Sequence, residues 1–188
     1  RESECFALTW SDIDFEKKKI KVCKQLLYQD KQWCFAPLKT VNSYRSVNIT
    51  AEFAQYLADM KMQHDAERKL YGDGYKRNFV TDRREPKKEK IIEVPDFINV
   101  KANGEMLTTN GAKFLARIIK KDLGIHFKFH NLRHTYATVL AENGLNPRYV
   151  QEMLGHSKLE FTLRYYTHIT EKMSDAAENA LTAAFRFD

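Results

Sequence analysis

Residues 130–138 read His-Asn-Leu-Arg-His-Thr-Tyr-Ala-Thr (HNLRHTYAT), and this stretch decides how the whole chain is interpreted. It opens a segment, 130–143, that the sequence predicts to be a helix stopped by Gly144. Positions i and i+3 share one face of a helix, so His130 and Arg133 point to the same side. A guanidinium binds two phosphate oxygens at once, and an imidazole exchanges a proton near neutral pH. The pair indicates a phosphate site, and a plain surface helix is the alternative when the motif stands alone.

A metal site is a second interpretation of the same helix, because His134 follows His130 by four residues. The glutamate of the HExxH motif is absent, however, and no third ligand follows at a recognisable spacing. The three cysteines, Cys5, Cys23 and Cys34, are odd in number and lack the CxxC spacing. They support neither a zinc site nor a disulfide framework and indicate a reducing interior. We therefore expect no metal.

Two further polar segments follow the helix. The segment LGHS (154–157) places a histidine directly after an expected tight turn at Gly155, and TLRYYTHIT (162–170) contains the adjacent tyrosines Tyr165 and Tyr166. A free tyrosine has a pKa of about 10, so it needs nearby cations and a base to attack at pH 7. Taken singly, each tyrosine is an ordinary amphipathic residue. Near two histidines and an arginine, Tyr166 becomes a candidate nucleophile.

Length and composition bound the class of protein. The chain has 188 residues, of which 43% are hydrophobic and 30% charged, as in a globular protein. At about 100–200 residues per domain we expect one domain. No apolar run of about 18 residues is present, so no transmembrane helix is predicted, and the first residues do not form a signal peptide.

Lysine and arginine outnumber aspartate and glutamate by 31 to 25. The net charge of +6 favours a polyanionic partner such as nucleic acid, with solvated surface lysines as the alternative.

The first half of the chain predicts a small antiparallel meander. Apolar alternation and turn residues indicate strands over 10–15, 20–28, 32–37 and 44–49. Lys39 lies in or beside the turn between the last two strands, which we expect to be a mobile hairpin turn.

Helices and one irregular region account for the rest. Thr50 is expected to cap a helix over 51–70 whose apolar face carries Phe53, Tyr56, Leu57 and Met60. Residues 71–97 break this regularity with a charged cluster between two apolar pairs, and we expect a protruding hairpin insertion there. The later helices are predicted from Thr108 or Thr109 to Gly124 (with Phe114, Leu115, Ile118 and Ile119 on one face), from Asn146-Pro147 to Leu154, over 159–165, and over 171–184.

Taken together, these motifs resemble those of tyrosine recombinases. HNLRHTYAT (130–138), NPRYVQEMLGHS (146–157) and TLRYYTHIT (162–170) resemble the catalytic half of that family, nearest to the integrases of phages and conjugative transposons. Residues 1–14 resemble the RxxE…L.W.DID opening of the same domain, and residues 38–47 resemble its KT…S.R…V segment. The matches span nearly the whole chain in the right order.

The resemblance implies an α+β, mainly helical fold with a small antiparallel three-stranded sheet on one side of a helical catalytic domain. Residues 1–188 are then a single catalytic domain without the N-terminal DNA-binding domains. The family pattern places the nucleophile two residues before the histidine of a YTH ending, here His168, which selects Tyr166 and leaves Tyr165 as the second choice. The active residues implied in this way are Arg1, Lys39, His130, Arg133, His156 and Tyr166.

The implied activity is site-specific DNA recombination through a covalent 3′-phosphotyrosine, without ATP, metal or another cofactor. Arg1 and Arg133 are expected to bind the non-bridging phosphate oxygens, and Lys39 to protonate the departing 5′-oxygen. His130 is expected to take the tyrosine proton or bind the phosphate, and His156 to donate a hydrogen bond to it. A non-cleaving DNA-binding module of the same fold and a type IB topoisomerase-like enzyme remain as alternatives.

The resemblance also implies partners and a setting. The expected partner is double-stranded DNA, bound by a homotetramer on paired sites during integration and excision of a mobile element. Residues 170–188 are expected to pack on a neighbouring protomer, and packing on their own domain is the alternative. The expected location is the bacterial cytoplasm, on the nucleoid when the protein is bound to DNA.

Overall fold

The computed structural model describes residues 1–166, so the expected helix 171–184 and the segment 170–188 lie outside it. The chain divides into two compact units, Arg1–His130 and Asn131–Asp188, which we call the first and the second unit. The expectation of one catalytic domain over 1–188 stays a prediction. No helix within residues 1–166 combines the length and the apolar composition needed to cross a membrane.

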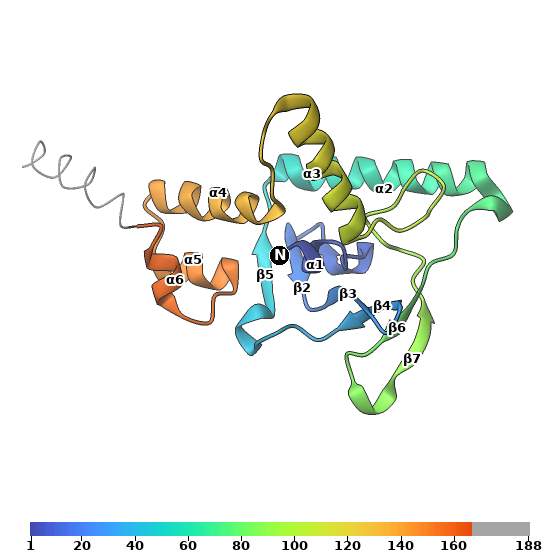
Figure 1. Cartoon of the computed structure of the whole chain (residues 1–188), viewed down its shortest axis with the longest axis horizontal. Coiled ribbons are helices and arrows are strands. Elements are labelled where there is room, and N and C mark those ends of the chain that lie inside the picture. Colours follow the sequence, from blue (N-terminus) through green and yellow to red (C-terminus); the bar gives the residue numbers. More distant parts are fainter. Residues whose placement is uncertain (167–188) are drawn as a thin grey trace, which may run out of the picture. The chain divides into compact units, whose positions relative to one another are not determined.

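The first unit contains two small sheets (Figure 1). The expected three-stranded antiparallel sheet is present, in the order β1-β2-β5. Its strands are β1 (Ile13–Asp14), β2 (Lys19–Val22) and β5 (Arg45–Asn48). The second sheet, in the order β3-β4-β6-β7, was not predicted, and its β4 and β6 are parallel. Its strands are β3 (Gln25–Gln29), β4 (Gln32–Ala36), β6 (Phe79–Asp82) and β7 (Lys90–Glu93).

The predicted single strand over 20–28 is wrong, because the chain leaves the first sheet at Lys24 and starts the second. Lys24 is buried, and its ammonium binds the Asp12 carboxylate and, at 3.1 Å, the Thr9 hydroxyl. A buried ammonium is costly unless it is paired and hydrogen-bonded. Asp12 belongs to a short 3-10 helix, Trp10–Asp12, so the expected strand over 10–15 is reduced to Ile13–Asp14.

Helix α2 (Ala51–Tyr71) follows β5, and its start was predicted correctly. The Thr50 hydroxyl accepts a hydrogen bond from the Phe53 amide at 3.2 Å, which satisfies one open donor of the first turn. The expected apolar face is only partly buried. Leu57 is enclosed, whereas Phe53 and Tyr56 are 44% and 60% exposed and stack on each other. This helix packs through Ala54 and Leu57.

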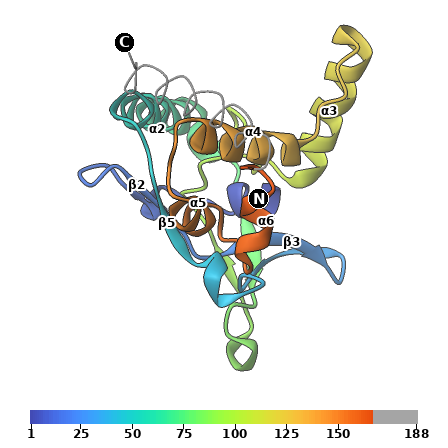
Figure 2. The ribbon, with the colours of Figure 1, turned by 90° about the vertical axis from the view of Figure 1, so that its left-hand side faces the viewer.

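Residues 79–93 form a hairpin of β6 and β7. The antiparallel pairs run from Phe79 with Glu93 to Asp82 with Lys90, and a 3-10 turn, Pro86–Lys88, joins the two strands. Figures 1 and 2 both show the hairpin projecting from the first unit on the side away from α2. That residues 71–97 are an insertion stays a prediction.

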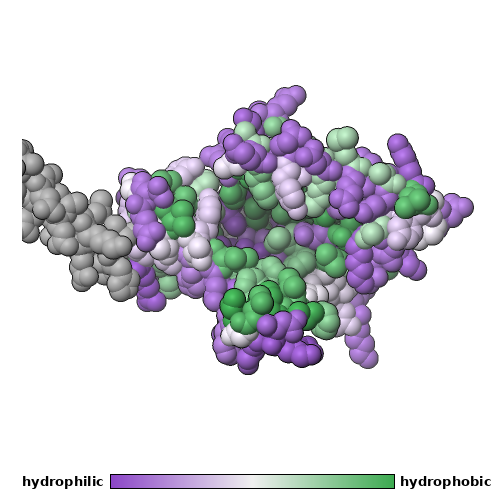
Figure 3. All heavy atoms as spheres, turned by 90° about the horizontal axis from the view of Figure 1, so that it is seen from above, coloured by the Kyte–Doolittle hydropathy of each residue, from purple (hydrophilic) through white to green (hydrophobic). Residues whose placement is uncertain are grey.

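Helix α3 (Thr109–Leu123) ends at Gly124, whose φ of +69° is the left-handed conformation that favours glycine. The apolar residues expected on one face of this helix are largely exposed: Phe114, Leu115 and Ile118 are 58%, 47% and 38% exposed. Figure 3 shows hydrophobic residues gathered in patches between hydrophilic ones on one face of the molecule.

The main apolar cluster of the first unit joins the residues that follow α1 (Glu2–Cys5) to the second sheet. Its buried members are Phe6, Ala7, Leu26, Phe35, Val80, Val94, Phe97 and Ala112.

Three helices follow: α4 (Phe129–Glu142), which carries the chain into the second unit, α5 (Pro147–Leu154) and α6 (Leu159–Leu163). Asn146 caps α5 by accepting a hydrogen bond from the Arg148 amide at 2.9 Å, as predicted. In the part of this unit that the structure describes, Ala137, Val150 and Leu154 form a buried cluster. Tyr165 and Tyr166 pack against this cluster.

Candidate active site

Arg1 is held by a buried carboxylate in the first unit. Its Nη1 donates to Glu4 Oε1 at 2.6 Å and to the Ser43 hydroxyl at 3.0 Å. Arg45 donates to the other Glu4 oxygen at 2.8 Å and to the Ser43 carbonyl at 2.9 Å. Glu4 therefore links two guanidinium groups, one from the start of the chain and one from β5. We call Arg1, Glu4, Ser43 and Arg45 the arginine network.

Electrostatics fix the charge of this network. Burial alone would raise the pKa of Glu4, but the hydrogen bonds from Arg45 and Arg1 outweigh it and lower the pKa to about 2. The carboxylate stays ionised at neutral pH and orients both arginines. Glu4 and Arg45 lie inside motifs recognised in the sequence, but only the contacts identify them as the partners that position Arg1.

Lys39 lies beside this network, on an exposed loop. The expected hairpin turn is wrong, since the strands before and after it, β4 and β5, belong to different sheets. The loop continues into a 3-10 turn, Val41–Ser43, where the Thr40 and Ser43 hydroxyls are 3.0 Å apart. Because Ser43 also accepts from Arg1, the loop of Lys39 is tied to the arginine network through Thr40, its neighbour, and Ser43, four residues further along the chain.

His130 and Arg133 lie one turn apart on α4, as the motif predicted. His130 is exposed, and Arg133 is half-buried. The Arg133 guanidinium donates to the Leu154 carbonyl, the last residue of α5. This contact ties the arginine to the segment that leads directly into His156.

His156 follows Gly155, which has a φ of +65° and reverses the chain at the end of α5. Its Nδ1 lies 3.0 Å from the hydroxyl of Thr162, a fully buried residue of α6. Its backbone carbonyl accepts a hydrogen bond from the Gln151 side chain at 3.1 Å. The turn at Gly155 and the Gln151 amide fix the backbone of His156, and the Thr162 hydroxyl contacts its imidazole. Thr162 is a partner that sequence reasoning did not identify.

Tyr166 packs its half-buried ring against the small core of the second unit. Its hydroxyl donates a hydrogen bond of 2.5 Å to the Leu145 carbonyl. Burial raises the pKa of this hydroxyl above its ordinary value. The candidate nucleophile is therefore a protonated phenol bound to a backbone oxygen.

The neighbouring Tyr165 has different surroundings. Its hydroxyl lies 2.5 Å from His134 Nδ1, and its ring is close to parallel with that of His156. Burial raises the pKa of Tyr165, and the charge of Arg133 lowers it in part. Of the predicted residues, Arg1 and the loop of Lys39 are linked in the first unit, which also contains His130, and Arg133, His156 and Tyr166 lie in the second.

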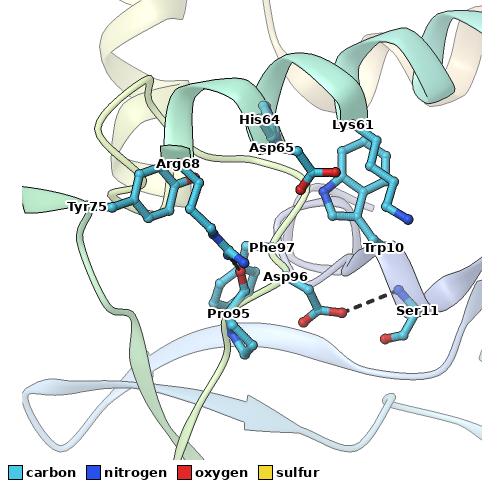
Figure 4. A pocket seen from close by; sticks show the side chains of 10 residues that line it. All are labelled: Trp10, Ser11, Lys61, His64, Asp65, Arg68, Tyr75, Pro95, Asp96 and Phe97. Atoms are coloured by element: carbon cyan, nitrogen blue, oxygen red, sulfur yellow. Dashed lines mark hydrogen bonds between the residues drawn. The ribbon is translucent and has the colours of Figure 1, made fainter. Parts of the chain in front are cut away.

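A separate pocket of about 350 Å³ in the first unit contains none of the predicted catalytic residues (Figure 4). It lies between α2, which contributes His64, Asp65 and Arg68, and the segment around Asp96. Burial lowers the pKa of His64 below its ordinary value. Both carboxylates (Asp65 and Asp96) and cations (Lys61 and Arg68) line the pocket. This mixture of charges does not favour an anionic ligand.

Comparison with known proteins places the chain in a family. Residues 1–173 match the family described as "Phage integrase family". This match covers most of the chain, so the protein belongs to the phage integrase family.

Individual relatives agree with this assignment. The chain is 32% identical to "Tyrosine recombinase XerC-like" of Caldanaerobacter subterraneus subsp. tengcongensis, over 98% of this chain and 46% of the relative. It is 28% identical to "Transposase from transposon Tn916" of Enterococcus faecalis, over 90% of this chain and 39% of the relative. The chain therefore spans about half the length of the relatives it matches, or less.

Solved structures share the fold. The Tn1549 transposon integrase in complex with transposon right end DNA has a TM-score of 0.72 and 26% identity, covering 97% of this chain and 55% of that one. XerA recombinase matches at 22% identity and a TM-score of 0.55, and the match covers 100% of this chain and 54% of the XerA chain. At this identity the likeness supports the fold alone. The expected α+β architecture with a small three-stranded sheet is confirmed.

Proposed function

We propose that the protein is a site-specific DNA recombinase that cuts and rejoins DNA through a 3′-phosphotyrosine on Tyr166. The observation that carries the proposal is the group of Arg133, His156 and Tyr166 within one compact unit of a phage integrase family chain. An arginine and a histidine that converge on neighbouring segments provide the donors that a phosphodiester under attack requires.

The reaction exchanges one phosphodiester for another. Tyr166 leaves the Leu145 carbonyl, passes its proton to a base, for which we propose His130, and its oxygen bonds to phosphorus. The bond from phosphorus to the 5′-oxygen breaks, and Lys39 supplies the proton that makes the leaving group a hydroxyl. The 5′-hydroxyl of a partner strand then attacks the phosphotyrosine and releases Tyr166. Arg1, Arg133 and His156 stabilise the negative charge of the transition state. No ATP or metal enters this scheme, so we expect EDTA to leave the cleavage rate unchanged.

The raised pKa of Tyr166 supports a requirement for a base. At pH 7 a phenol with a pKa above 10 is almost fully protonated, so attack needs proton transfer in the same step. The positive charges of two arginines around the phosphate lower the cost of the developing phenolate.

The proposed partner is double-stranded DNA, bound mainly through phosphates met by lysine and arginine, with an affinity that falls steeply with salt. We further propose a homotetramer on paired sites in the bacterial cytoplasm, acting in the integration and excision of a mobile element. Residues 170–188 are proposed to pack on a neighbouring protomer. Deleting residues 171–188 should weaken assembly on paired sites more than affinity for a single site, as measured by native gel shift; unchanged assembly would reject the exchange.

A nicked suicide duplex tests the activity, because loss of a short fragment traps the covalent intermediate. Wild type and Tyr165→Phe should form a covalent protein–DNA band, and Tyr166→Phe should form none. No band from the wild-type protein on DNA it binds would favour the non-cleaving DNA-binding module. If the protein relaxes a supercoiled plasmid but exchanges no strands between two sites, the result would favour the topoisomerase-like alternative.

A further inference from the structure

The two adjacent tyrosines of the second unit differ in what their hydroxyls bind. Tyr166 donates to the Leu145 carbonyl, whereas the Tyr165 hydroxyl lies 2.5 Å from the Nδ1 atom of His134. The rings of His134 and Tyr165 have centroids 5.6 Å apart. A side chain that binds another side chain at this distance has lost much of its rotational freedom. Tyr165 is therefore fixed at both its backbone and its hydroxyl.

The ring of Tyr165 lies along the ring of His156. The centroids are 6.5 Å apart and the planes differ by only 10°, which is a parallel aromatic arrangement. The Phe161 ring meets the same imidazole edge-on, with centroids 6.2 Å apart and planes at 64°. Two aromatic rings therefore border His156 from two directions.

One nitrogen of His156 is already committed. Nδ1 lies 3.0 Å from the Thr162 hydroxyl, and Thr162 is fully buried, so this contact fixes one point of the ring. Rotation of the imidazole about its Cβ–Cγ bond moves Nδ1 away from this hydroxyl, but the torsion has a broad energy well, so one hydrogen bond limits the rotation only loosely. A parallel ring beside it restricts that rotation. In the tautomer in which Nδ1 accepts from the Thr162 hydroxyl, Nε2 carries a proton that it can donate to a phosphate oxygen.

We infer that Tyr165 is a positioning residue for the proposed cleavage reaction: its ring sets the plane of His156, and its hydroxyl is held by His134. The inference rests on the proposed function, in which His156 Nε2 donates to the scissile phosphate. It also assigns a role to His134, which the HNLRHTYAT motif places one residue after Arg133 and which the proposed reaction leaves unused. Tyr166 remains the nucleophile.

Substitutions of Tyr165 separate the ring from the hydroxyl. Tyr165→Phe keeps the ring and removes the bond to His134, so the single-turnover cleavage rate on the suicide duplex should fall about twofold to tenfold. Tyr165→Leu removes the parallel ring and leaves the His156 imidazole less restricted, which should lower the rate on the order of 10²-fold. The DNA dissociation constant should stay the same in both variants. Tyr149→Phe, which removes the hydroxyl of an exposed tyrosine in the same unit, is the matched control and should cleave like wild type.

A double-mutant cycle tests the link to His134. His134→Phe and Tyr165→Phe remove the same hydrogen bond, so the double variant should cleave no more slowly than the slower single variant. Fully additive losses would overturn the pairing of the two residues. A merely structural role predicts instead a lower melting temperature and a weaker DNA affinity with an unchanged rate for the bound, folded protein.

An NMR measurement without DNA keeps the inference separate from the proposed function. The ring protons and nitrogens of His156, assigned by comparison with His156→Gln, should shift in Tyr165→Leu and much less in Tyr165→Phe. Unchanged His156 resonances in Tyr165→Leu overturn the inference whether or not the protein cleaves DNA. A covalent band that Tyr165→Phe abolishes and Tyr166→Phe retains also overturns it, because Tyr165 would then be the nucleophile. No band from wild type, with the His156 shift present, contradicts the proposed function and leaves the ring contact established.

Discussion

The two groups of predicted site residues are held by different forces. In the first unit, Arg1 is part of a network of full charges around the buried Glu4 carboxylate, whose pKa is lowered to about 2. In the second unit, His156 and both tyrosines are held by hydroxyl, carbonyl and ring contacts, and burial raises the pKa of both phenols.

The difference indicates how the two groups can serve one reaction. A cation that binds a phosphate needs no change of state, so a permanent ion-pair network can orient it in advance. A nucleophile must change its charge and its partner during the reaction, and a neutral hydrogen bond to a carbonyl is easier to exchange than an ion pair. In the proposed reaction, the ion pairs of Arg1 would orient it for phosphate binding, and the neutral hydrogen bond of Tyr166 would keep it protonated until it attacks.

Arg133 gives the largest expected effect, because it is the arginine of the second unit that we propose binds the scissile phosphate. Arg133→Ala should lower the single-turnover cleavage rate by about 10²–10³-fold, the usual cost of one lost donor to the transition state. Binding to DNA at low salt should persist. Arg148→Ala removes the same charge from an exposed position on α5 and serves as the control. If Arg133→Ala lowers DNA binding and cleavage equally, Arg133 positions the DNA and does not act specifically on the transition state.

Glu4 tests whether the first unit depends on its charges. Glu4→Gln leaves Arg1 and Arg45 without the carboxylate that pairs them, which should cost about 3 kcal/mol of unfolding free energy, as for other broken buried pairs. Urea unfolding at pH 7 measures it. Glu93→Gln, which breaks an exposed pair with Arg77, should cost much less, because water screens the pair. Similar losses in the two variants would contradict the special position of Glu4.

The pH dependence of stability follows from the same carboxylate. A lowered folded-state pKa means that the stabilisation is complete above the ordinary pKa of 4.5 and is lost as the pH falls to about 2. Over this window the unfolding free energy should fall by up to about 1.4 kcal/mol per pH unit through this one group. The difference between wild type and Glu4→Gln, from urea titrations at several pH values, should shrink in parallel. A constant difference from pH 6 to pH 2 is the contrary result.

Helix caps provide the smallest effect and compare the two units directly. Thr50→Ala at α2 and Asn146→Ala at α5 each remove a capping acceptor and should cost about 1 kcal/mol. Only the second change lies next to the segment that leads to His156, so only Asn146→Ala should also slow cleavage. Equal cleavage rates in the two variants would show that α5 is fixed without its cap.

Local signals in the sequence predicted much of this molecule. The caps at Thr50 and Asn146, the stops at Gly124 and Gly155, and the helix of the HNLRHTYAT motif depend on neighbours in the chain, and all were predicted correctly. The second sheet was missed because β4 and β6 pair across more than forty positions of sequence, a contact that no local pattern encodes. Likewise, exposed Phe53 and Phe114 follow helical spacing but lie where no neighbour covers them in the part of the chain described.

The site shows the same contrast between local sequence signals and long-range contacts. The residue types and their spacing identified Arg1, Lys39, His130, Arg133, His156 and Tyr166 as candidates, and their assignment to catalysis stays a prediction. Their partners came only from the structure: Glu4 reaches Arg45 across the first unit, and Thr162 turns a buried hydroxyl toward His156.

The identity of the tyrosine joined to DNA tests the central claim most directly. The wild-type protein is trapped on the nicked suicide duplex, digested with nuclease and protease, and the modified peptide is sequenced by mass spectrometry. A 3′-phosphonucleotide on Tyr166, with Tyr165 unmodified, is the predicted result. A nucleotide on Tyr165 or on any other residue, or DNA that is bound but never joined, would contradict the account.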